Sequence, residues 1–433
     1  MANRGSETQT GGRPASTGVI PGDYALSVGR PNKPAPPGWS WTALSEVARL
    51  ETGHTPSRRH PEYWGGDVPW IGIKDATANH GRMISDTYQH TNELGIANSS
   101  ARILPSQTVC LSRTASVGYV VVMGRPMATS QDFVNWVCSD AIDYNFLKYV
   151  LIAEHDAFLR FASGTTHQTI YFPEVKAFHV CLPPREEQRA IAHILGTLDD
   201  KIELNRRMNE TLEAIERSIF AHREGEDEWP ELLLEQACAI YDGPHATPKL
   251  VDAGPIFLGI SNLNEGSLVL SDVAHVTDED FVKWTRRVTP SARDVVFSYE
   301  TRLGQAALIP DSLKCCLGRR MGLLRPKTGM TEGVILLRAY LAAEFQEIIR
   351  QRTVHGSTVD RIPLKEMGQF PIRLPQGAAM DRLATELTPL RAKIEHNQRM
   401  SRTLAALRDT LLPKLISGEL RVKAAEKIVE AVA

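Results

Sequence analysis

The chain has 433 residues, of which 42% are hydrophobic and 23% are charged, and its formal net charge is -2. This length exceeds one ordinary domain, and the composition excludes both a disordered chain and, with no apolar run near ~20 residues, a membrane-spanning one. The near-neutral charge excludes a strongly basic nucleic-acid binder acting alone, so any DNA contact must come from local basic patches or from partner subunits. Six cysteines without a CxxC pair favour reduced thiols and a cytoplasmic location.

Residues 1–37 are rich in Gly, Ser, Thr and Pro, which predicts a flexible N-terminal arm. Residues 38–183 form the first predicted domain. They combine one helical segment, at about 144–161, with short β-favouring runs at 68–73, 108–111 and 117–122. Short strands mixed with a helix predict an α+β domain.

Residues 184–224 are predicted to form a long central helix. Its apolar residues recur at spacings of three and four, which is typical of a coiled-coil seam: Ile191, Leu195, Leu198, Ile202, Met208, Leu212, Ile215 and Ile219. Asn205 falls on this seam near the middle of the helix, where a buried Asn fixes the register of pairing. The alternative is a tolerated polar residue at a solvated position. Gly196-Thr197 predicts a break or kink in the helix.

The second half of the chain repeats the first. Eight of the twelve residues at 201–212 recur at 393–404, so that Ile202 returns as Ile394, 192 residues later. Average composition predicts about one match in such a window. A period this long indicates a duplicated domain with its helix rather than a solenoid, whose repeats run ~20–50 residues.

The repeat divides the second half in the same way. It gives a second domain at 228–374, a C-terminal helix at 375–421 with an expected break at Thr388-Pro389, and a tail at 422–433. The predicted fold class is α+β: two similar, β-rich mixed domains separated by two long antiparallel coiled-coil helices, related by pseudo-twofold symmetry. The predicted helix-pairing residues, with Asn205 close to Asn397, are Ile202, Asn205, Leu212, Ile394, Asn397 and Leu404.

The motifs of common enzymes are absent from the sequence. There is no Asn/Asp-Pro-Pro-aromatic methyltransferase signature, no Gly-rich cofactor loop, no phosphate loop and no zinc-binding spacing. We therefore expect a binding protein with no catalytic residues, no metal and no cofactor of its own.

Several short motifs occur in a fixed order, and part of the set occurs twice. They are Gly53-His54-Thr55-Pro56-Ser57, Pro61-Glu62-Tyr63-Trp64-Gly65-Gly66, Val68-Pro69-Trp70-Ile71, Lys74-Asp75, the Leu-Pro pairs at 182–183 and 374–375, Glu187-Gln188-Arg189-Ala190-Ile191, and the segment 412–420. This ordered set resembles the DNA specificity subunit of type I restriction–modification systems, over about residues 38–421. One departure is Gly377-Ala378-Ala379-Met380, which replaces the Glu-Gln pair in the second copy.

The resemblance implies a complete assembly. Two target-recognition domains would each bind one part of a split, asymmetric site on double-stranded DNA, and the paired helices would dock two methyltransferase (modification) subunits. Those subunits would hold S-adenosylmethionine and methylate adenine, and restriction/translocase subunits would use ATP and Mg²⁺. The chain itself would be a non-catalytic, cytoplasmic subunit with no membrane contact.

Basic and polar side chains on the expected loops are the candidate DNA contacts, because Arg and Lys bind phosphates or guanine and Gln can bracket adenine. In the first domain they are Arg58, Arg59, Lys74, Arg113, Thr165, Thr166, His167 and Gln168. In the second domain they are His245, Lys249, Asn262, Tyr299, Arg302, Arg319, Arg320, Ser357 and Thr358. A solvated charge or a local ion pair is the alternative for each residue alone. Trp64 and Trp70 are interpreted as core aromatics rather than base-stacking platforms.

Two other classes of function are compatible with the sequence. One is a self-sufficient DNA methyltransferase or nuclease with unrecognised motifs, and the other is a coiled-coil scaffold whose domains bind proteins. Activity of the purified chain alone would indicate the enzyme, and DNA footprinting would distinguish the scaffold.

Overall fold

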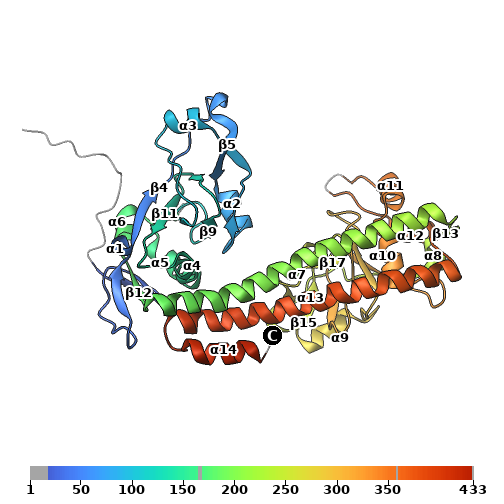
Figure 1. Ribbon diagram of the computed structural model, residues 1–433. Coiled ribbons are helices and arrows are strands. Elements are labelled where there is room, and N and C mark those ends of the chain that lie inside the picture. The colour runs from blue at the N-terminus through green and yellow to red at the C-terminus, as the bar shows by residue number, and fades with distance from the viewer. Residues whose placement is uncertain (1–17, 164–167, 357–358, 432–433) are drawn as a thin grey trace, which may run out of the picture. The chain divides into compact units, whose positions relative to one another are not determined.

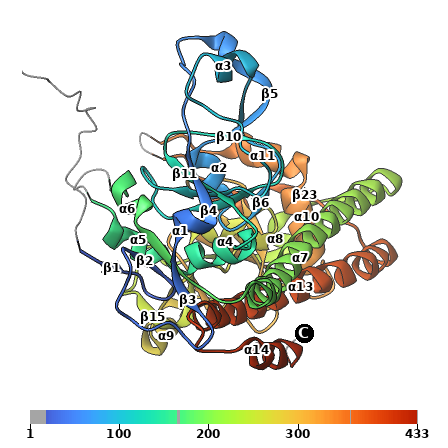
Figure 2. The same ribbon diagram turned by 60° about the vertical axis from the view of Figure 1, so that its left-hand side comes forward.

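The computed structural model describes residues 18–163, 168–356 and 359–431. The chain divides into two compact units, Met1–Lys201 with Leu404–Ala433, and Ile202–Thr403. Two long helices, α7 (Arg185–Glu226) and α13 (Ala378–Ile416), each contribute one part to either unit and run side by side (Figures 1 and 2). The rest of each unit is a mixed α/β domain, which confirms the predicted fold class.

A five-stranded sheet lies at the centre of the first unit, in the order β4-β11-β8-β9-β6. All neighbours are antiparallel except β6 and β9. Helix α4 packs on β8 and β9 and buries Phe146 and Tyr149, while Trp136 and Phe158 complete the core. The elements are β4 (Ala48–Thr52), β11 (Phe133–Cys138), β8 (Val109–Ser112), β9 (Val120–Met123), β6 (Met83–Ile84), α4 (Tyr144–Ala153) and α5 (His155–Phe161).

A smaller sheet, β10-β5-β7, forms the part of the first unit that lies far from α7 (Figures 1 and 2). Strand β5 runs parallel to β10 and antiparallel to β7. Short helices surround this sheet, and the strands and helices are β10 (Ala128–Thr129), β5 (Trp64–Ile71), β7 (Gln89–Thr91), η1 (Pro61–Tyr63), α2 (Ile73–Ala78) and α3 (Glu93–Ala97). The long strand explains the predicted run at 68–73, although β5 begins earlier.

The N-terminal arm is ordered from residue 18 onward, so the prediction of flexibility is wrong for residues 18–37. A third sheet, β1-β2-β12-β3, contains two strands from this segment. Its elements are β1 (Ile20–Pro21), β2 (Leu26–Val28), β12 (Phe178–Leu182) and β3 (Ser40–Ala43), followed by α1 (Leu44–Val47). The buried carboxylate of Glu154 accepts four backbone N–H bonds, from Asp23 to Leu26, at 2.6 to 3.0 Å. This contact from Glu154, which lies between α4 and α5, orders a segment whose composition suggested disorder.

The second unit repeats the strand orders of the first. Sheet β14-β22-β19-β20 corresponds to β4-β11-β8-β9, sheet β18-β15-β21 to β7-β5-β10, and pair β13-β23 to β3-β12. The parallel and antiparallel relations also match, since β15 is parallel to β21 and antiparallel to β18. The strands are β13 (Glu231–Leu233), β14 (Cys238–Asp242), β15 (Val251–Leu258), β18 (Ala274–His275), β19 (Val295–Ser298), β20 (Ala306–Leu308), β21 (Cys315–Leu317), β22 (Met321–Pro326) and β23 (Pro371–Arg373). The duplication seen in the sequence is therefore a duplication of topology.

The two units differ in their additions to this shared plan. The second unit has a small hairpin, β16 (Leu263–Asn264) with β17 (Ser267–Leu268), while the first has β1, β2 and β6. Its helices are α8 (Leu234–Ala237), η2 (Ile260–Asn262), α9 (Asp278–Trp284), α10 (Gly333–Leu341), α11 (Ala343–Arg352) and α12 (Leu364–Met367). The C-terminal tail predicted at 422–433 contains a helix, α14 (Val422–Glu430), and α6 (Phe172–Lys176) precedes β12.

Helices α7 and α13 pair antiparallel, as predicted. In the second unit, Asn205 Nδ2 donates to the carbonyl oxygen of Asn397 at 3.5 Å and to Ser401 Oγ at 3.2 Å. Asn205, Ile394, Asn397 and Leu404 are buried in the helix pair, and Ile202 and Leu212 are half-buried. The prediction that Asn205 lies near Asn397 is confirmed.

Two details of the predicted helices are wrong. Ile215 is 41% exposed, and Glu216 takes the buried position beside it. Glu216 turns inward because two arginines of the same unit neutralise it, Arg391 and Arg338. Neither helix breaks at its predicted position, because α7 continues through Gly196 and α13 through Pro389.

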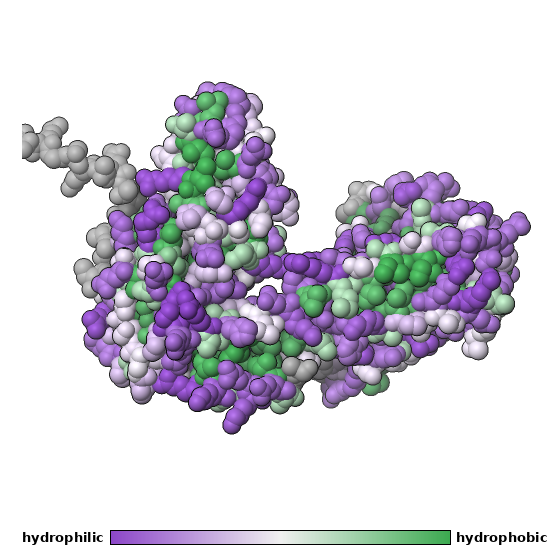
Figure 3. Space-filling view, in the orientation of Figure 1, coloured by the Kyte–Doolittle hydropathy of each residue, from purple (hydrophilic) through white to green (hydrophobic). Residues whose placement is uncertain are grey.

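The surface and the thiols add little specific to function. Figure 3 shows a face that is mostly hydrophilic, with separate hydrophobic patches. No helix within the described residues is both long and apolar enough to cross a membrane. All six cysteines are free thiols, five buried and Cys138 half-buried. Burial raises the pKa of the Cys181 thiol to about 11 and that of Cys138 to about 12, so these thiols are protonated at neutral pH.

Candidate nucleic-acid interface

Arg58 is held over an aromatic pair at the small sheet of the first unit. Its guanidinium carbon lies 3.7 Å from the ring centroid of Trp64 and 5.1 Å from that of Trp70. Its Nη2 donates to Gln89 Oε1 at 2.7 Å. Trp70 is buried, as predicted for a core aromatic, whereas Trp64 is half-buried and supports the arginine. A stacked guanidinium loses little entropy on binding and still has donors for a phosphate or a guanine.

Lys74 lies in helix α2, just after strand β5 of the small sheet. Its Nζ is 4.0 Å from the ring centroid of Tyr88, the residue before Gln89, and both Lys74 and Tyr88 are exposed. Arg59 is also exposed. The structure therefore gathers three of the predicted cations, together with two side chains that the sequence did not single out, Tyr88 and Gln89.

Arg113 lies on a loop that is linked to the loop of Arg58. Its Nη2 donates to the carbonyl oxygen of Gln131 at 3.0 Å, and its guanidinium carbon is 4.7 Å from the ring centroid of Phe172. Burial lowers the pKa of Arg113 from its usual value. The exposed side chain of Gln131 forms a hydrogen bond with Thr55 Oγ1, which ties the two loops together.

Gln168, the other described candidate of this domain, borders the same loops. It is exposed and precedes Thr169, whose hydroxyl is 2.8 Å from that of Thr114. Thr165, Thr166 and His167 lie outside the described residues. We name residues 53–60, 113–116, 131–132 and 168–172, taken together, the first loop surface.

The second unit presents equivalent loops, at 243–249, 299–303, 319–320 and 359–361, which we name the second loop surface. The backbone is the same at corresponding points. Ala115 and Thr301 both have positive φ, 66° and 68°. Arg113 N donates to Asp132 O at 2.8 Å, and Tyr299 N donates to Arg320 O at 3.2 Å. One scaffold thus carries two sets of side chains.

A basic cavity of about 580 Å³ adjoins the second loop surface. His245 Nε2 lies 2.9 Å from Asp242 Oδ2, and Arg287 Nη1 lies 3.5 Å from the same oxygen. Lys283 Nζ lies 4.8 Å from the ring centroid of Trp284. The lining residues are Asp242, Gly243, Pro244, His245, Ala246, Lys283, Trp284, Arg286, Arg287, Val288 and Leu317. Four cationic or titratable groups around one acid and one aromatic ring suit a polyanion.

The other predicted cationic side chains of this domain differ in their internal ion pairs and hydrogen bonds. Arg320 Nε is 2.8 Å from Glu300 Oε2, so this charge is paired, and Arg302 Nη1 makes a long bond of 3.4 Å to the carbonyl oxygen of Ile260. Lys249 and Arg319 are exposed. Ser357 and Thr358 lie outside the described residues.

Two residues of the second domain that were predicted to contact DNA are buried, and their side chains lie inside the domain. Asn262 accepts from Gly259 N at 2.8 Å, and both hydrogens of its amide are used at 3.0 Å, on the carbonyl oxygens of Val269 and Asp272. Tyr299 is 5% exposed, and burial, with Asp242 nearby, raises the pKa of its hydroxyl. We remove Asn262 and Tyr299 from the candidate DNA contacts, because DNA cannot reach side chains whose polar groups face the interior.

The role of Asn262 is matched by Asp75 in the first domain. Asp75 Oδ2 accepts from Gly72 N and its Oδ1 accepts from Tyr88 N, both at 2.8 Å. Both side chains close the turn that follows the long strand of the small sheet. The Gly-x-x-Asp/Asn spacing common to both halves could have identified this structural role.

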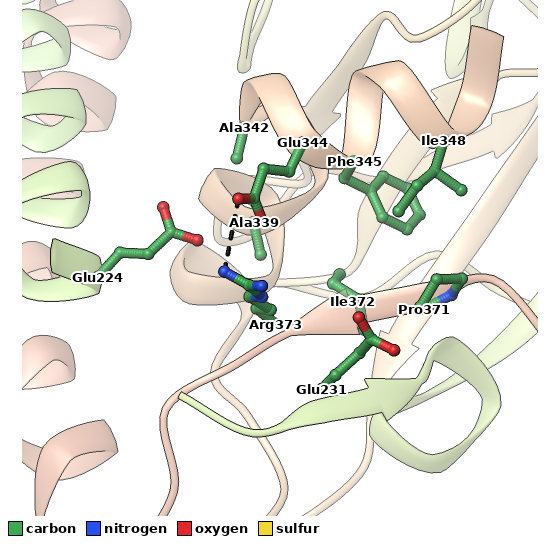
Figure 4. A pocket seen from close by; sticks show the side chains of 10 residues that line it. All are labelled: Glu224, Glu231, Ala339, Ala342, Glu344, Phe345, Ile348, Pro371, Ile372 and Arg373. Carbon is green, nitrogen blue, oxygen red and sulfur yellow. Dashed lines mark hydrogen bonds and ion pairs between the residues drawn. The ribbon is translucent and has the colours of Figure 1, made fainter. Parts of the chain in front are cut away.

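A second cavity, of about 110 Å³, is acidic and has the opposite character (Figure 4). Glu224, Glu231 and Glu344 surround Arg373, which is 3.4 Å from Glu344 Oε1. Burial, followed by repulsion from Glu344, raises the pKa of Glu224. Three carboxylates around one arginine disfavour a nucleic-acid phosphate. In the part of the chain that the structure describes, no cluster of His, Cys, Asp or Glu could hold a metal ion.

The sequence missed Lys283, Arg286 and Arg287 as candidate contacts. The available signal was the Arg286-Arg287 doublet, which begins two residues after the last residue of helix α9, Trp284. Gln89 and Gln131 were missed because no local pattern shows that they meet Arg58 and Arg113.

The duplicated mixed domains, joined by two long helices, are similar to those of DNA-specificity proteins. A model described as the type I restriction modification DNA specificity domain matches residues 36–214. The type I restriction enzyme MjaIX specificity subunit of Methanocaldococcus jannaschii is 25% identical over 414 residues, covering 90% of this chain and 95% of that protein. The HindI specificity subunit of Haemophilus influenzae is 32% identical over 113 residues, 26% of this chain and 24% of that protein.

A solved structure shows the same fold. The S subunit of a type I restriction–modification system from M. genitalium has a TM-score of 0.55, with 16% identity over 87% of this chain and 96% of that one. Residues 36–214 thus match the DNA specificity domain of type I restriction–modification systems, and the chain as a whole is similar to their specificity subunits.

Proposed function

We propose that each domain reads one part of a split, asymmetric site on double-stranded DNA. The observation that carries this proposal is the repeated sheet order, which presents two loop surfaces with matching backbone features and different side chains. Shared scaffolds with divergent loops are the usual way in which one fold recognises different targets. The first loop surface offers Arg58, Arg113, Gln131 and Gln168. The second offers His245 and several arginines, and Lys283 lines the cavity beside it.

The charges support DNA rather than a protein as the partner of these surfaces. Stacked or exposed Arg and Lys side chains bind phosphates, and Gln or Arg can pair with adenine or guanine in the major groove. The whole chain has a formal charge of -2, so we expect basic partner subunits to supply further phosphate contacts.

The proposed assembly contains the partners implied by the family. Two methyltransferase subunits, which hold S-adenosylmethionine, dock on the helix pair, and restriction/translocase subunits that use ATP and Mg²⁺ join them. The chain itself recognises the target sequence, with no cofactor and no catalytic residue of its own, and works in the cytoplasm where the DNA is. Incubation of the purified chain alone with DNA and S-adenosylmethionine, or with Mg²⁺ and ATP, should give no methylation and no cleavage.

A domain exchange tests the division into two readers. Residues 38–183 are replaced by the corresponding domain of a relative with a different target, and the complex with its methyltransferase subunits is expressed in a host. Methylation sequencing of the genome should show one half of the site changed and the other half retained. The reciprocal exchange of residues 228–374 is the matched control. A change in both halves after either exchange would contradict the proposal.

A further inference from the structure

Each unit contains an ion pair that joins an acid of α7 to an arginine of α13 near the seam. In the first unit, Arg408 Nη1 lies 2.8 Å from Asp199 Oδ1. In the second unit, Arg391 pairs with the fully buried Glu216. The acid stands on α7 and the base on α13 in both units. Four charged residues therefore form two layers with one polarity.

These two layers occupy equivalent positions of the duplicated sequence. The repeat places Asp199 at the position of Arg391 and Glu216 at the position of Arg408, because both correspondences have the 192-residue offset that joins Asn205 to Asn397. The positions correspond, but the charges are reversed. A duplicated helix would have started with the same charge at both copies, so the difference separates one helix from the other.

The surroundings of each layer hold its charges in place. Asp199 Oδ2 accepts a hydrogen bond from Tyr149 at 2.7 Å, and Arg338 Nε lies 3.7 Å from Glu216 Oε2. Glu216 and Arg391 are both shielded from solvent. Reversing one partner of a buried pair leaves an uncompensated charge, which is strongly unfavourable.

The polar layer between these ion pairs does not distinguish the helices. Asn205 donates to Ser401 at 3.2 Å, and Asn397 donates to Asn209 at 2.8 Å, so the two bonds are repeats of one another. If α7 met the α7 of a second copy in the same register, Asn205 would lie opposite Asn209 and could form the same kind of bond. This layer fixes the register of the helices, but it is compatible with pairing between two identical helices.

The charged layers disfavour pairing between two identical helices. In the same register, a pair of α7 helices would place Asp199 of one chain against Glu216 of the other. A pair of α13 helices would place Arg391 against Arg408. Like charges in direct contact are strongly unfavourable and exclude wrong partners.

We propose that the layers Asp199–Arg408 and Glu216–Arg391 act as a pairing code that allows α7 to bind only α13 and prevents each helix from pairing with its own copy. The code disfavours a dimer in which two identical helices pair with each other. It is independent of DNA reading, and its test requires no DNA.

The test exchanges the charges of one layer in the full chain. The variant Asp199→Arg with Arg408→Asp keeps an opposite-charge pair between α7 and α13. It also makes both layers complementary when two α7 helices meet, because the arginine introduced at position 199 would face Glu216 of the copy. The matched control is Arg223→Glu with Glu386→Arg, a second ion pair between the same helices with nearly the same exposure, 30% and 31% against 30% and 28%. The repeat equivalents of this control pair are Ile194 and Leu415, so its exchange adds no attraction between copies.

A cysteine at position 208 reports which helices meet. Met208 is half-buried and lies near the point where two antiparallel α7 helices would cross in register. With the six native cysteines replaced by alanine and Met208→Cys introduced in every variant, a disulfide-linked dimer forms only when α7 meets α7. The chains are unfolded, refolded together at high concentration, oxidised, and examined on a non-reducing gel and by light scattering after size exclusion.

The exchanged layer should raise the fraction of linked dimer at least about tenfold over the unexchanged chain, whereas the control exchange should leave it unchanged. Equal dimer fractions in the two exchanged variants would overturn the proposal. If the exchanged layer prevents refolding, Asp199→Asn with Arg408→Gln decides, because it removes the repulsion without reversing a charge. This neutral variant should raise the dimer fraction several-fold, and a value equal to that of the control would refute the code.

Discussion

Replacing Glu154 should release the N-terminal segment from the first unit. The carboxylate is fully buried and accepts the backbone N–H groups of residues 23 to 26, with Oε1 serving three of them and Oε2 the fourth. Glu154→Ala removes the acceptor of all four bonds. A buried donor left without a partner costs about 1–3 kcal/mol. The N–H groups of Ala25 and Leu26 are buried, so we expect a loss of about 2–6 kcal/mol in the stability of the first unit.

Glu154→Gln should have a smaller effect. The amide oxygen can serve the three N–H groups that Oε1 now accepts, while its NH₂ group would face Asp23 N, a donor facing a donor. One lost bond and one lost charge predict a cost of about 1–3 kcal/mol. Glu426→Ala is the control, because Glu426 is an exposed residue of α14, where a substitution changes stability by less than about 0.5 kcal/mol.

Hydrogen exchange of the full chain, read at residues 18–30, is the direct assay, and urea unfolding supplies the free energies. Glu154→Ala should lose protection at residues 23–26 and gain protease cleavage within residues 18–37. The reasoning is refuted if these amides stay as protected as in the Glu426→Ala variant and the urea midpoint is unchanged.

Three further predictions concern the helices, the DNA surface and the acidic cavity. Replacing both Asn205 and Asn397 by Leu should raise the melting temperature while loosening register, which cysteine cross-links between α7 and α13 would show as several linked positions instead of one. Arg58→Ala should weaken DNA binding by the methyltransferase complex about tenfold and lower its salt dependence by about one ion, measured by fluorescence anisotropy at several salt concentrations; an unchanged salt slope would exclude a phosphate contact. The pKa of Glu224 is raised, so its ionisation destabilises the folded chain as pH rises above 4.5. Glu224→Gln should therefore match the wild type at lower pH and melt at a higher temperature near neutral pH, and a difference that does not vary with pH would contradict this.

The sequence predicted those elements whose pattern is local. The strands at 108–111 and 117–122 and the helical segment at 144–161 were found because apolar runs and helical periodicity depend on neighbouring residues. The helix divides into α4 and α5 at Glu154, the residue whose carboxylate holds the arm. Its partners are about 130 residues away in the sequence, so composition alone gave a flexible arm.

The seam between α7 and α13 shows that apolar periodicity alone does not determine which side chains are buried. Spacings of three and four placed Ile215 inside, whereas the structure turns Glu216 inward. A buried carboxylate is unfavourable unless it is paired, and its partner Arg391 belongs to the other helix. Charge pairing between distant segments therefore overrode the apolar pattern. A single sequence does not show which arginine will pair with Glu216.

The duplicated sequence separates scaffold residues from candidate reading residues. Asp75 and Asn262 stand at equivalent positions, and each accepts a hydrogen bond from the N–H of the glycine three residues earlier. This shared residue pattern is therefore needed by the fold. Positions that differ between the halves are free to read DNA. Lys74 corresponds to Ser261, and Arg113 corresponds to Tyr299.

The repeat also separates the individual candidates from one another, and their contacts with DNA stay a prediction. Asn262 was selected for its polar chemistry, although its shared position marks it as part of the scaffold. Arg58, with Leu250 at the equivalent position, meets the opposite criterion: it differs between halves, and its stacked guanidinium is exposed. A recognition surface must vary while the turns beneath it stay constant, so the residues that specify DNA are those that the repeat fails to predict.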